Sequence, residues 1–475
     1  MVYYLKMESG RVTILIRKTA LSILLAVSLF FGTTAVWAAP KANLQSDQAF
    51  DNKIVKRIKV ENIYNHIAEL SKSPRVAGTA GEKAAVDYIK DQFESYGYKT
   101  ELQAFDIYSY TEPSLIELRV DGMTFEPVPS NFTYGVNGEV TNELVYVGLG
   151  GPTDFEGRGV GGKIALIERG TYSFTEKILN AAEAGASAVI IYNNADGVIN
   201  GTLGEPNDKY VPALAITQDQ GLALKERLDK GETVTATLKV EGAKTDEATS
   251  HNVVATKEAT QKSTNQLVLV GAHHDSVEGA PGANDDASGT ATVLELARVF
   301  ANAPTDTDIR FVTFGAEENG LLGSYEFVER MTEDDYGRTV GMFQMDMVGS
   351  KDAGSLIMYT ADGEKNIVTN LGASAGARLS ETGEATPYGW EGRSDHVPFA
   401  EIGLPAALFI HAPVEPWYHS PKDTLDKISL DKLKEVSNIV GAAVYQVARA
   451  DTPALEKAKV APKEVDYNFE ERELE

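Results

Sequence analysis

Histidine and carboxylate side chains gather in a few short, glycine-rich stretches in the second half of this sequence. The stretch "GAHHDSVEGAPGANDDASG", residues 271–289, holds two histidines, three aspartates and a glutamate. Further along the chain come the pair Glu317–Glu318, then Asp346, then His419. Imidazole and carboxylate groups are the zinc ligands that remain when thiolates are absent, and the chain has no cysteine. These residue types therefore predict a metal site.

The number of candidate ligands indicates two metal ions. Two ions about 3.5–4 Å apart need one shared carboxylate, and each needs a further histidine and acid. The motifs contain two histidines in this context, His273 and His419, together with several acids. Any one cluster could instead be a helix cap or a surface ion pair. Several clusters at the ends of successive predicted strands are not explained in that way.

The pair Glu317–Glu318 suggests how such a site could do chemistry. Neighbouring side chains in an extended segment point to opposite sides. One carboxylate can therefore bind a metal ion while the other takes a proton from the attacking water and passes it to a leaving amine. The alternative is a pair of exposed glutamates that open a loop. The apolar segment directly before them disfavours this alternative.

The clusters follow segments that have the pattern of buried strands. These segments alternate with helical stretches, one of which spans residues 430–448, and this alternation predicts a parallel sheet buried on both faces. Ligands of such sheets bind at the carboxyl ends of the strands. We therefore expect an α/β fold that brings the clusters together at one edge. The strand-like segments are "QLVLVGAHHD", "DIRFVTFGAEENG", "VGMFQMDMVGS" and "LPAALFIHAP".

The N-terminus and the charge bear on location and partners. Residues 1–38 have basic residues, an apolar run and small residues at Val36 and Ala38, which is the pattern of an export signal cleaved after Ala38. An uncleaved anchor is the alternative, because residues 20–39 carry no charge. The formal net charge of −25 argues against nucleic acid and anionic membranes as partners. We expect a secreted, extracellular protein, either free or attached to the cell wall, with no membrane contact after cleavage.

The clustered stretches resemble peptidase family M28, a family of zinc metallopeptidases that are mostly aminopeptidases with two zinc ions. The opening "SPRVAGTAGEKAAVDYI" is also similar to the family's first segment, and the whole resembles the secreted aminopeptidases of the bacillus group. The resemblance implies a zinc-peptidase fold of the phosphorylase/hydrolase-like type, in which helices sandwich a mixed, mostly parallel twisted sheet. The matching stretches, in the family's order, are "GAHHDS", "PGANDDASG", "FGAEENGLLGS", "MDMVGS", "GRSDHVPF" and "YHSPKDT".

The middle of the chain resembles a β-rich protease-associated (PA) domain inserted in the catalytic domain. It is rich in glycine and valine and contains one clear helical segment, "FTEKILNAAEAG". Ahead of it we expect an irregular start at residues 39–58 and a helix near Glu82–Ser95. The predicted parts are a signal peptide at 1–38, the catalytic domain at 39–114 and 246–452, the PA domain at 115–245 and an acidic tail at 453–475.

Residue by residue, the resemblance implies a ligand set for two zinc ions per chain. His273 and Asp346 would bind one ion, while Glu318 and His419 would bind the other. Asp285 would bridge the two ions, and the peptide bond that follows it is cis in relatives.

The resemblance also implies roles for neighbouring residues. Glu317 would be the general base, Tyr418 would donate to the oxyanion of the tetrahedral intermediate, and Asp275 would orient His273. Arg393 could bind substrate or pair with Asp395. Tyr388 and Trp390 could form the wall of a substrate pocket or simply pack. The remaining histidines are expected to be structural or to lie beside the site: His66, His251, His274, His396 and His411.

The predicted function is an exported aminopeptidase with two zinc ions, which hydrolyses N-terminal residues from peptides by metal-activated water with Glu317 as general base. Its partners would be peptides with a free N-terminus. A carboxypeptidase or dipeptidase of the same family is one alternative, disfavoured because only Arg393 offers a cation near the motifs. A non-catalytic peptide-binding receptor module is another, disfavoured because every ligand position is filled.

Overall fold

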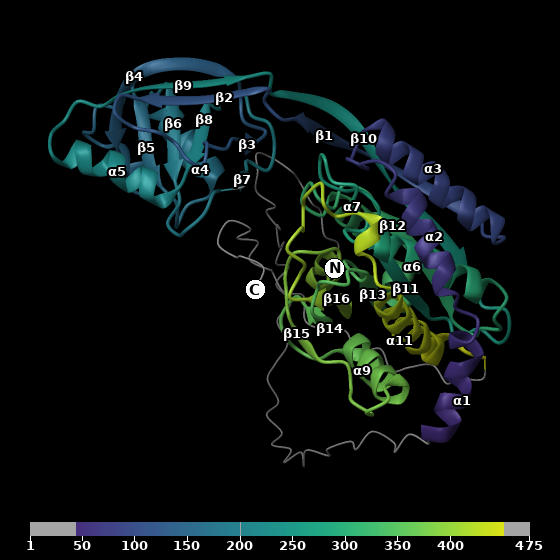
Figure 1. Ribbon diagram of the computed structural model, residues 1–475. Helices are drawn as coiled ribbons and strands as arrows, with labels where there is room; N and C mark the ends of the chain where they lie inside the picture. The colour runs from purple at the N-terminus through teal and green to yellow at the C-terminus, as the bar shows by residue number, and fades with distance from the viewer. Residues whose placement is uncertain (1–43, 200, 451–475) are drawn as a thin grey trace, which may run out of the picture. The chain divides into compact units, whose positions relative to one another are not determined.

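A computed structural model describes residues 44–199 and 201–450 of the chain (Figure 1). The predicted export signal and acidic tail lie outside these residues. Within them, no helix combines the length and the apolar character needed to cross a membrane.

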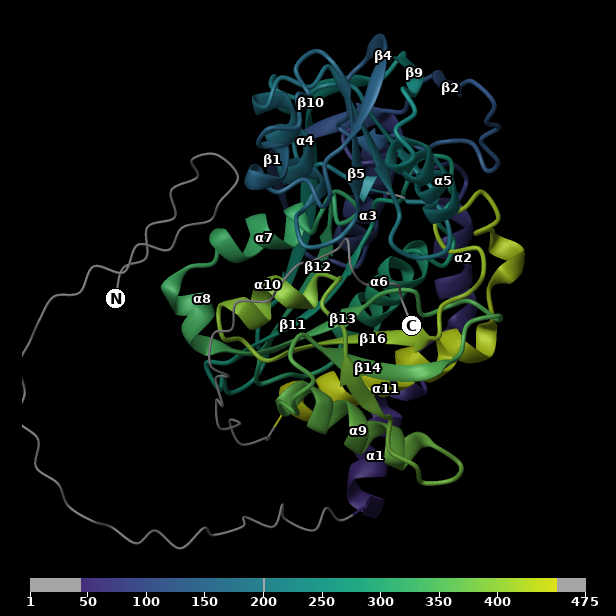
Figure 2. The same ribbon diagram turned by 90° about the vertical axis from the view of Figure 1, so that its left-hand side faces the viewer.

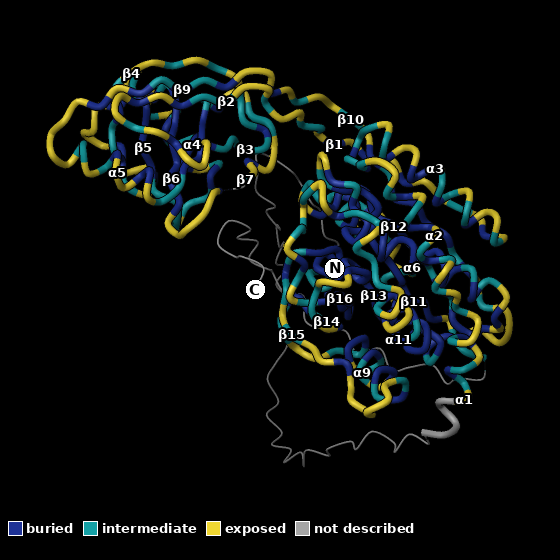
Figure 3. Tube along the Cα trace, viewed as in Figure 1, coloured by how far each residue is buried: buried dark blue, intermediate teal, exposed yellow. Residues whose placement is uncertain are grey.

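The larger of the two main sheets has eight strands and is mixed, as predicted. Four neighbouring strands in its centre, β12, β11, β13 and β16, run parallel, and β10 and β14 join them antiparallel on either side. The central strands are buried along most of their length (Figure 3). In spatial order the strands are β1 (Thr100–Thr111), β10 (Lys244–Lys257), β12 (Asp308–Phe314), β11 (Leu267–His273), β13 (Thr339–Met345), β16 (Ala406–Ala412), β14 (Ser355–Thr360) and β15 (Tyr388–Trp390).

Helices cover both faces of this sheet (Figure 2). Along β11, Val268 and Val270 pack into a core with α2, α3, α6 and α11, whereas Leu267 and Leu269 pack into a second core with α7 and α10. This explains the continuous apolar run of the strand, because both of its faces are buried. The helices are α2 (Val60–Leu70), α3 (Ala80–Ser95), α6 (Ala287–Ala301), α7 (Leu322–Glu329), α8 (Glu333–Arg338), α9 (Ile367–Leu379), α10 (His396–Glu401) and α11 (Leu430–Ala448), with the short 3-10 helix η2 at Leu425–Lys427.

The prediction of an irregular start is wrong, because a helix, α1, spans Leu44–Val55. Two residues of this polar segment explain the helix. Ile54 is buried in the core that also contains α11, and the Asp51 carboxylate accepts a hydrogen bond of 2.6 Å from Nε of Arg378 on α9. Both charged side chains are almost completely buried. The segment is therefore helical because its few docking residues lie on one face.

A second sheet contains six strands and is built from residues 115–241, inside the range predicted to be the PA domain. Apolar clusters pack on its two faces. Its helix α4 (Phe174–Glu183) was predicted, whereas α5 (Gln218–Asp229) was not, because Leu224 is its only buried large apolar side chain. The strands, in spatial order, are β2 (Leu115–Val120), β9 (Thr235–Glu241), β4 (Gly138–Tyr146), β5 (Ile164–Glu168), β6 (Ala188–Tyr192) and β8 (Ala213–Ile216); β3 (Phe132–Thr133) pairs with β7 (Gly201–Thr202), and a 3-10 helix, η1, spans Pro152–Phe155.

The buried pair between Asp51 and Arg378 gives a prediction about stability. Arg378→Met keeps the length of the side chain but removes the guanidinium that pairs with the buried Asp51 carboxylate. Removing one partner of a buried ion pair costs about 3–5 kcal/mol, and urea unfolding should show a loss of that size. The matched control is Lys83→Met, which breaks the exposed pair with Asp87 and should change stability little. Similar small losses in the two variants would contradict the prediction.

Candidate metal centre

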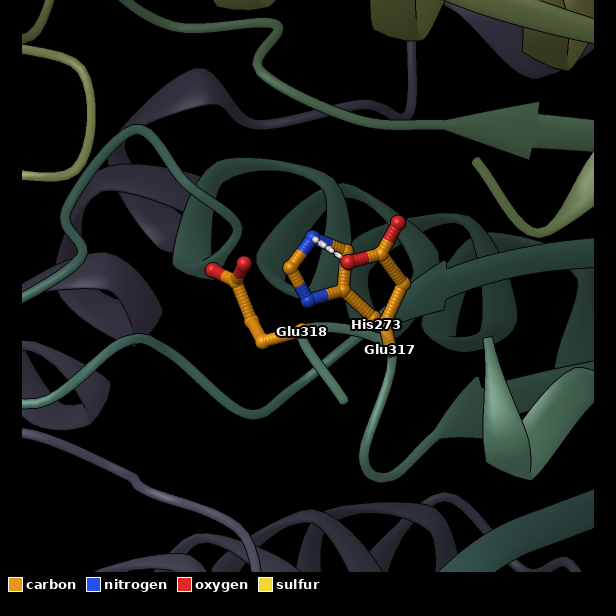
Figure 4. Close-up of side chains that lie close together, drawn as sticks. All are labelled: His273, Glu317 and Glu318. Carbon is orange, nitrogen blue, oxygen red and sulfur yellow. Dashed lines mark ion pairs between the residues drawn. The ribbon is translucent and has the colours of Figure 1, made fainter. Parts of the chain in front are cut away.

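The candidate ligands lie at the carboxyl ends of adjacent parallel strands. His273 is the last residue of β11, and Asp346 directly follows β13. Glu317 and Glu318 come three and four residues after the end of β12. His419 lies in the loop that follows β16. Because these strands are neighbours in the sheet, their ends bring together side chains from four separate stretches of sequence. Figure 4 shows His273 from one stretch, with Glu317 and Glu318 from another.

Asp285 lies between two histidines and divides its oxygens between them. Oδ1 is 3.2 Å from Nε2 of His273, and Oδ2 is 3.2 Å from Nε2 of His419. Asp346 Oδ1 is 3.5 Å from His273 Nε2, and Glu318 Oε2 is 3.0 Å from His419 Nε2. The donors thus form two groups of three that share Asp285.

The spacing and the chemistry of these donors fit zinc. Bonds of about 2.0–2.1 Å in a tetrahedral site place neighbouring donors about 3.3 Å apart, close to the 3.0–3.5 Å seen here. Asp346 Oδ1 and Glu318 Oε1 are also buried with no hydrogen-bond partner among the described residues. Such atoms are uncommon unless something else binds them. The other oxygen of Asp346 accepts a hydrogen bond of 2.9 Å from Ser394 Oγ, which leaves Oδ1 toward His273.

Asp286, the second acid of "NDD", makes different contacts from Asp285, the first. Asp286 Oδ1 accepts hydrogen bonds from the backbone N–H of Gly289, at the start of α6, and of Met347. Its Oδ2 accepts from the backbone N–H of His273. Asp286 therefore caps α6 and joins three segments, and Asp285 alone lies between the histidines. The peptide bond between these two aspartates is cis, as the family resemblance implied.

The Asp275 carboxylate fixes the turn that carries the two glutamates. Its two oxygens accept hydrogen bonds from the backbone N–H of Glu317, at 3.1 Å, and of Glu318, at 3.2 Å. Oδ1 also lies 3.4 Å from Nδ1 of His273. A single buried carboxylate thus faces the ring of one candidate ligand and holds the backbone of another.

The two adjacent glutamates point in different directions (Figure 4). Glu318 belongs to the group with His419, and it also forms a third group of possible metal donors with His273 and Glu317, which does not include Asp285. Glu317 lies outside the two groups that share Asp285, with its Oε2 3.9 Å from Nε2 of His273. Burial raises the pKa of Glu317 well above its ordinary value, despite the opposing effect of His273. A raised pKa makes this carboxyl group a weaker acid than a free one, so it holds a transferred proton more readily.

His419 and Tyr418 are adjacent residues whose rings stack, with centroids 3.7 Å apart. Burial alone would lower the pKa of His419, but the carboxylates of Glu318 and Asp285 outweigh it and raise this pKa to about 11. A metal ion must displace that proton in order to bind. Burial and the nearby carboxylates raise the pKa of Tyr418 well above its ordinary value, so this phenol keeps its proton and can donate a hydrogen bond.

The residues predicted to contact substrate lie on and just after the edge strand β15. Tyr388 and Trp390 are each 41% exposed. Arg393 forms a two-pronged ion pair with Glu391, with both N–O distances 2.9 Å. Glu391 and Ser394 were not among the predicted site residues. Their only signal in the sequence was that they flank or belong to the stretch "GRSDHVPF".

The remaining histidines lie outside the groups around Asp285. His274 is buried, with Nδ1 3.1 Å from the hydroxyl of Thr313. His66 lies between the hydroxyl groups of Tyr88 and Tyr96. Their partners indicate structural roles.

Comparison with known proteins identifies the family. The sequence model of the family described as peptidase family M28 matches residues 252–444 of the chain. The family model of the PA domain matches residues 140–224. The chain is 36% identical over 403 residues to aminopeptidase YwaD of Bacillus subtilis, covering 83% of this chain and 86% of that protein. The chain therefore belongs to peptidase family M28 and carries a PA domain, which confirms both predictions.

Two solved structures resemble the chain over most of its length. An aminopeptidase from Aneurinibacillus sp. strain AM-1 is 56% identical, with a TM-score of 0.81, covering 88% of this chain and 99% of that one. BSAP, a zinc aminopeptidase from Bacillus subtilis, is 34% identical with a TM-score of 0.67. The match covers 85% of this chain and 98% of that one. These likenesses confirm the predicted fold of a mixed sheet between helices.

The contacts of Asp275 give a prediction for zinc affinity. Asp275→Asn keeps the shape of the side chain but replaces one of its two acceptor oxygens with an NH2 group, whose nitrogen cannot accept a hydrogen bond from a backbone N–H. Loss of such an orienting partner typically weakens metal binding by 10–100-fold. Competition with a chelator should show a loss in that range, while circular dichroism confirms the fold. Unchanged zinc affinity would mean that Asp275 does not position the site.

Proposed function

We propose that this chain is an exported zinc-dependent aminopeptidase that holds two zinc ions per chain and uses Glu317 as its general base. The observation that carries the proposal is that Asp285 belongs to two groups of possible metal donors, one with His273 and Asp346 and the other with Glu318 and His419. Glu317 belongs to neither of these two groups. Membership of family M28, together with the zinc aminopeptidase of Bacillus subtilis among its structural relatives, supports the activity and the metal. The apolar run and small residues of the N-terminus support export.

The residues around the ions divide the work of hydrolysis. When bound, zinc polarises the scissile carbonyl and lowers the pKa of the attacking water. Glu317 accepts the proton of that water and passes it to the departing amine. Tyr418 donates a hydrogen bond to the oxyanion that forms on the former carbonyl. Asp275 keeps Glu317 and His273 in place.

Specificity for a free N-terminus follows from the charge of the site. Asp285, Glu318, Asp346 and Glu317 place four carboxyl groups at the site, so a substrate ammonium group would find hydrogen-bond acceptors there. An ammonium group beside such carboxylates gains a charge-assisted hydrogen bond worth roughly 1.5–3 kcal/mol. A carboxypeptidase would need a cation for the terminal carboxylate. The guanidinium of Arg393 is already paired with Glu391, which disfavours that alternative.

Glu317→Gln tests the assignment of the general base. The amide has nearly the same size but cannot accept the proton, so kcat should fall by about 10²–10⁴. The variant should retain its zinc. Glu318→Gln is the matched control, because it changes the adjacent residue in the same way and should lose zinc. Near-normal kcat in Glu317→Gln would exclude Glu317 as the base. If Glu317→Gln lost zinc and Glu318→Gln retained it, Glu317 would be the metal ligand and Glu318 the base.

A peptide series tests specificity for the N-terminus. A leucyl peptide, its N-acetyl form and its C-terminal amide are compared by kcat/KM. Acetylation removes the ammonium charge and should lower kcat/KM at least tenfold to a hundredfold, since each 1.4 kcal/mol corresponds to a factor of about ten. Amidation should matter little. Equal cleavage of the free and acetylated peptides, or dependence on the C-terminal carboxylate, would contradict an aminopeptidase.

A further inference from the structure

His419 is the candidate ligand whose position is least fixed by the sheet. It lies in residues 413–424, which form neither helix nor strand. Its side chain is 36% exposed, whereas the side chains of the other candidate ligands are at most 10% exposed. Its φ angle of +52° lies in the left-handed region, which is unfavourable for a residue other than glycine. Other contacts must therefore hold this loop so that its imidazole faces Asp285 and Glu318.

Two buried carboxylates bracket His419 in the sequence, and both bind the same residue. Glu415 Oε1 accepts a hydrogen bond of 2.8 Å from the side-chain amide of Asn284. Asp423 accepts from the backbone N–H of Asn284, at 2.8 Å, and from that of Asp285, at 3.0 Å. Glu415 and Asp423 are only 2% and 1% exposed. The loop is thus attached on both sides of His419 to the residue that precedes the bridging aspartate.

Asn284 is itself fixed from a third direction. Its side-chain oxygen accepts a hydrogen bond of 2.7 Å from the backbone N–H of Gly349, in the segment that follows Asp346. The backbone oxygen of Asn284 accepts a further bond from Ser288 Oγ in α6. Because it is held in this way, Asn284 offers a rigid anchor, and a loop attached to it keeps a fixed position relative to Asp285.

We propose that Glu415 and Asp423 are positioning residues that fasten the His419 loop to Asn284 and thereby set the affinity of one zinc ion, the ion between Glu318 and His419. This inference rests on the two-ion site of the proposed function. The other ion shares Asp285 but otherwise depends on His273 and Asp346, which are placed by strand ends, and Glu415 contacts none of these three residues directly. Loosening the loop should therefore weaken the binding of one zinc ion selectively. A general loss of stability would instead weaken the binding of both ions.

A zinc titration of the mature protein, with a competing chelator, tests the inference with a matched pair of variants. Glu415→Met keeps the length of the side chain but offers Asn284 no oxygen, so the affinity of one zinc ion should fall about 10–100-fold. Glu415→Gln retains an oxygen that can accept from Asn284 and should keep both affinities. Asp426→Asn, which neutralises an exposed acid just beyond the loop, should also keep both. Equal affinities in the Met and Gln variants would overturn the proposal.

A second comparison identifies the ion that is affected. In a His419→Ala background only the ion at His273 and Asp346 remains, and Glu415→Met should not weaken it further. A further loss there would show that the substitution disturbs the whole site and would overturn the proposal. If Glu415→Met does not fold, Glu415→Ala is compared with Glu415→Gln in the same way, because Asp423 also accepts from the backbone N–H of Asp285 and its loss would disturb both ions. A wild-type protein that binds one zinc ion would instead refute the two-ion site of the proposed function, whatever the variants do.

Discussion

The structure depends on a single carboxylate, that of Asp285, facing two imidazoles at once. Each of its oxygens is 3.2 Å from a different histidine nitrogen, so a small rotation of the side chain would spoil both distances. The surrounding backbone is correspondingly constrained. At Gly282, φ is +60° and an added Cβ would meet the guanidinium of Arg75. That guanidinium is buried and donates to the carbonyl oxygens of Gly282 and His274, which holds both ends of the loop that leads to Asp285.

The sheet explains how residues far apart in the sequence meet this constraint. Its central strands are packed on both faces, so they cannot shift without disturbing two cores. Candidate ligands at the ends of such strands, such as His273 and Asp346, have positions that are fixed by the sheet. His419 does not, and its position depends on hydrogen bonds from polar side chains. The two donor groups therefore share the same chemistry but differ in what positions them.

The parts that could be predicted from the sequence are those whose signal is local. The strands before the clusters and helix α11 have continuous or periodic apolar patterns, and α11 spans the predicted residues 430–448. Helix α1 was missed because its packing depends on a partner in α9, over three hundred residues away. The contact between Asn284 and Glu415 likewise joins residues 131 positions apart, and no pattern around either residue announces it. The motifs thus contained several of the residues that hold the site, but apart from Asp275 the sequence did not show which contacts these residues make.

The raised pKa of His419 has a consequence for how the empty site would take up metal. Before metal is present, a proton on this imidazole supplies positive charge to Asp285 and Glu318, which would otherwise be buried together uncompensated. The empty pocket therefore holds less uncompensated negative charge than its carboxylates alone would give it. Binding of a metal ion by His419 would release this proton, so the affinity of the pocket for metal should fall as the solution becomes more acidic.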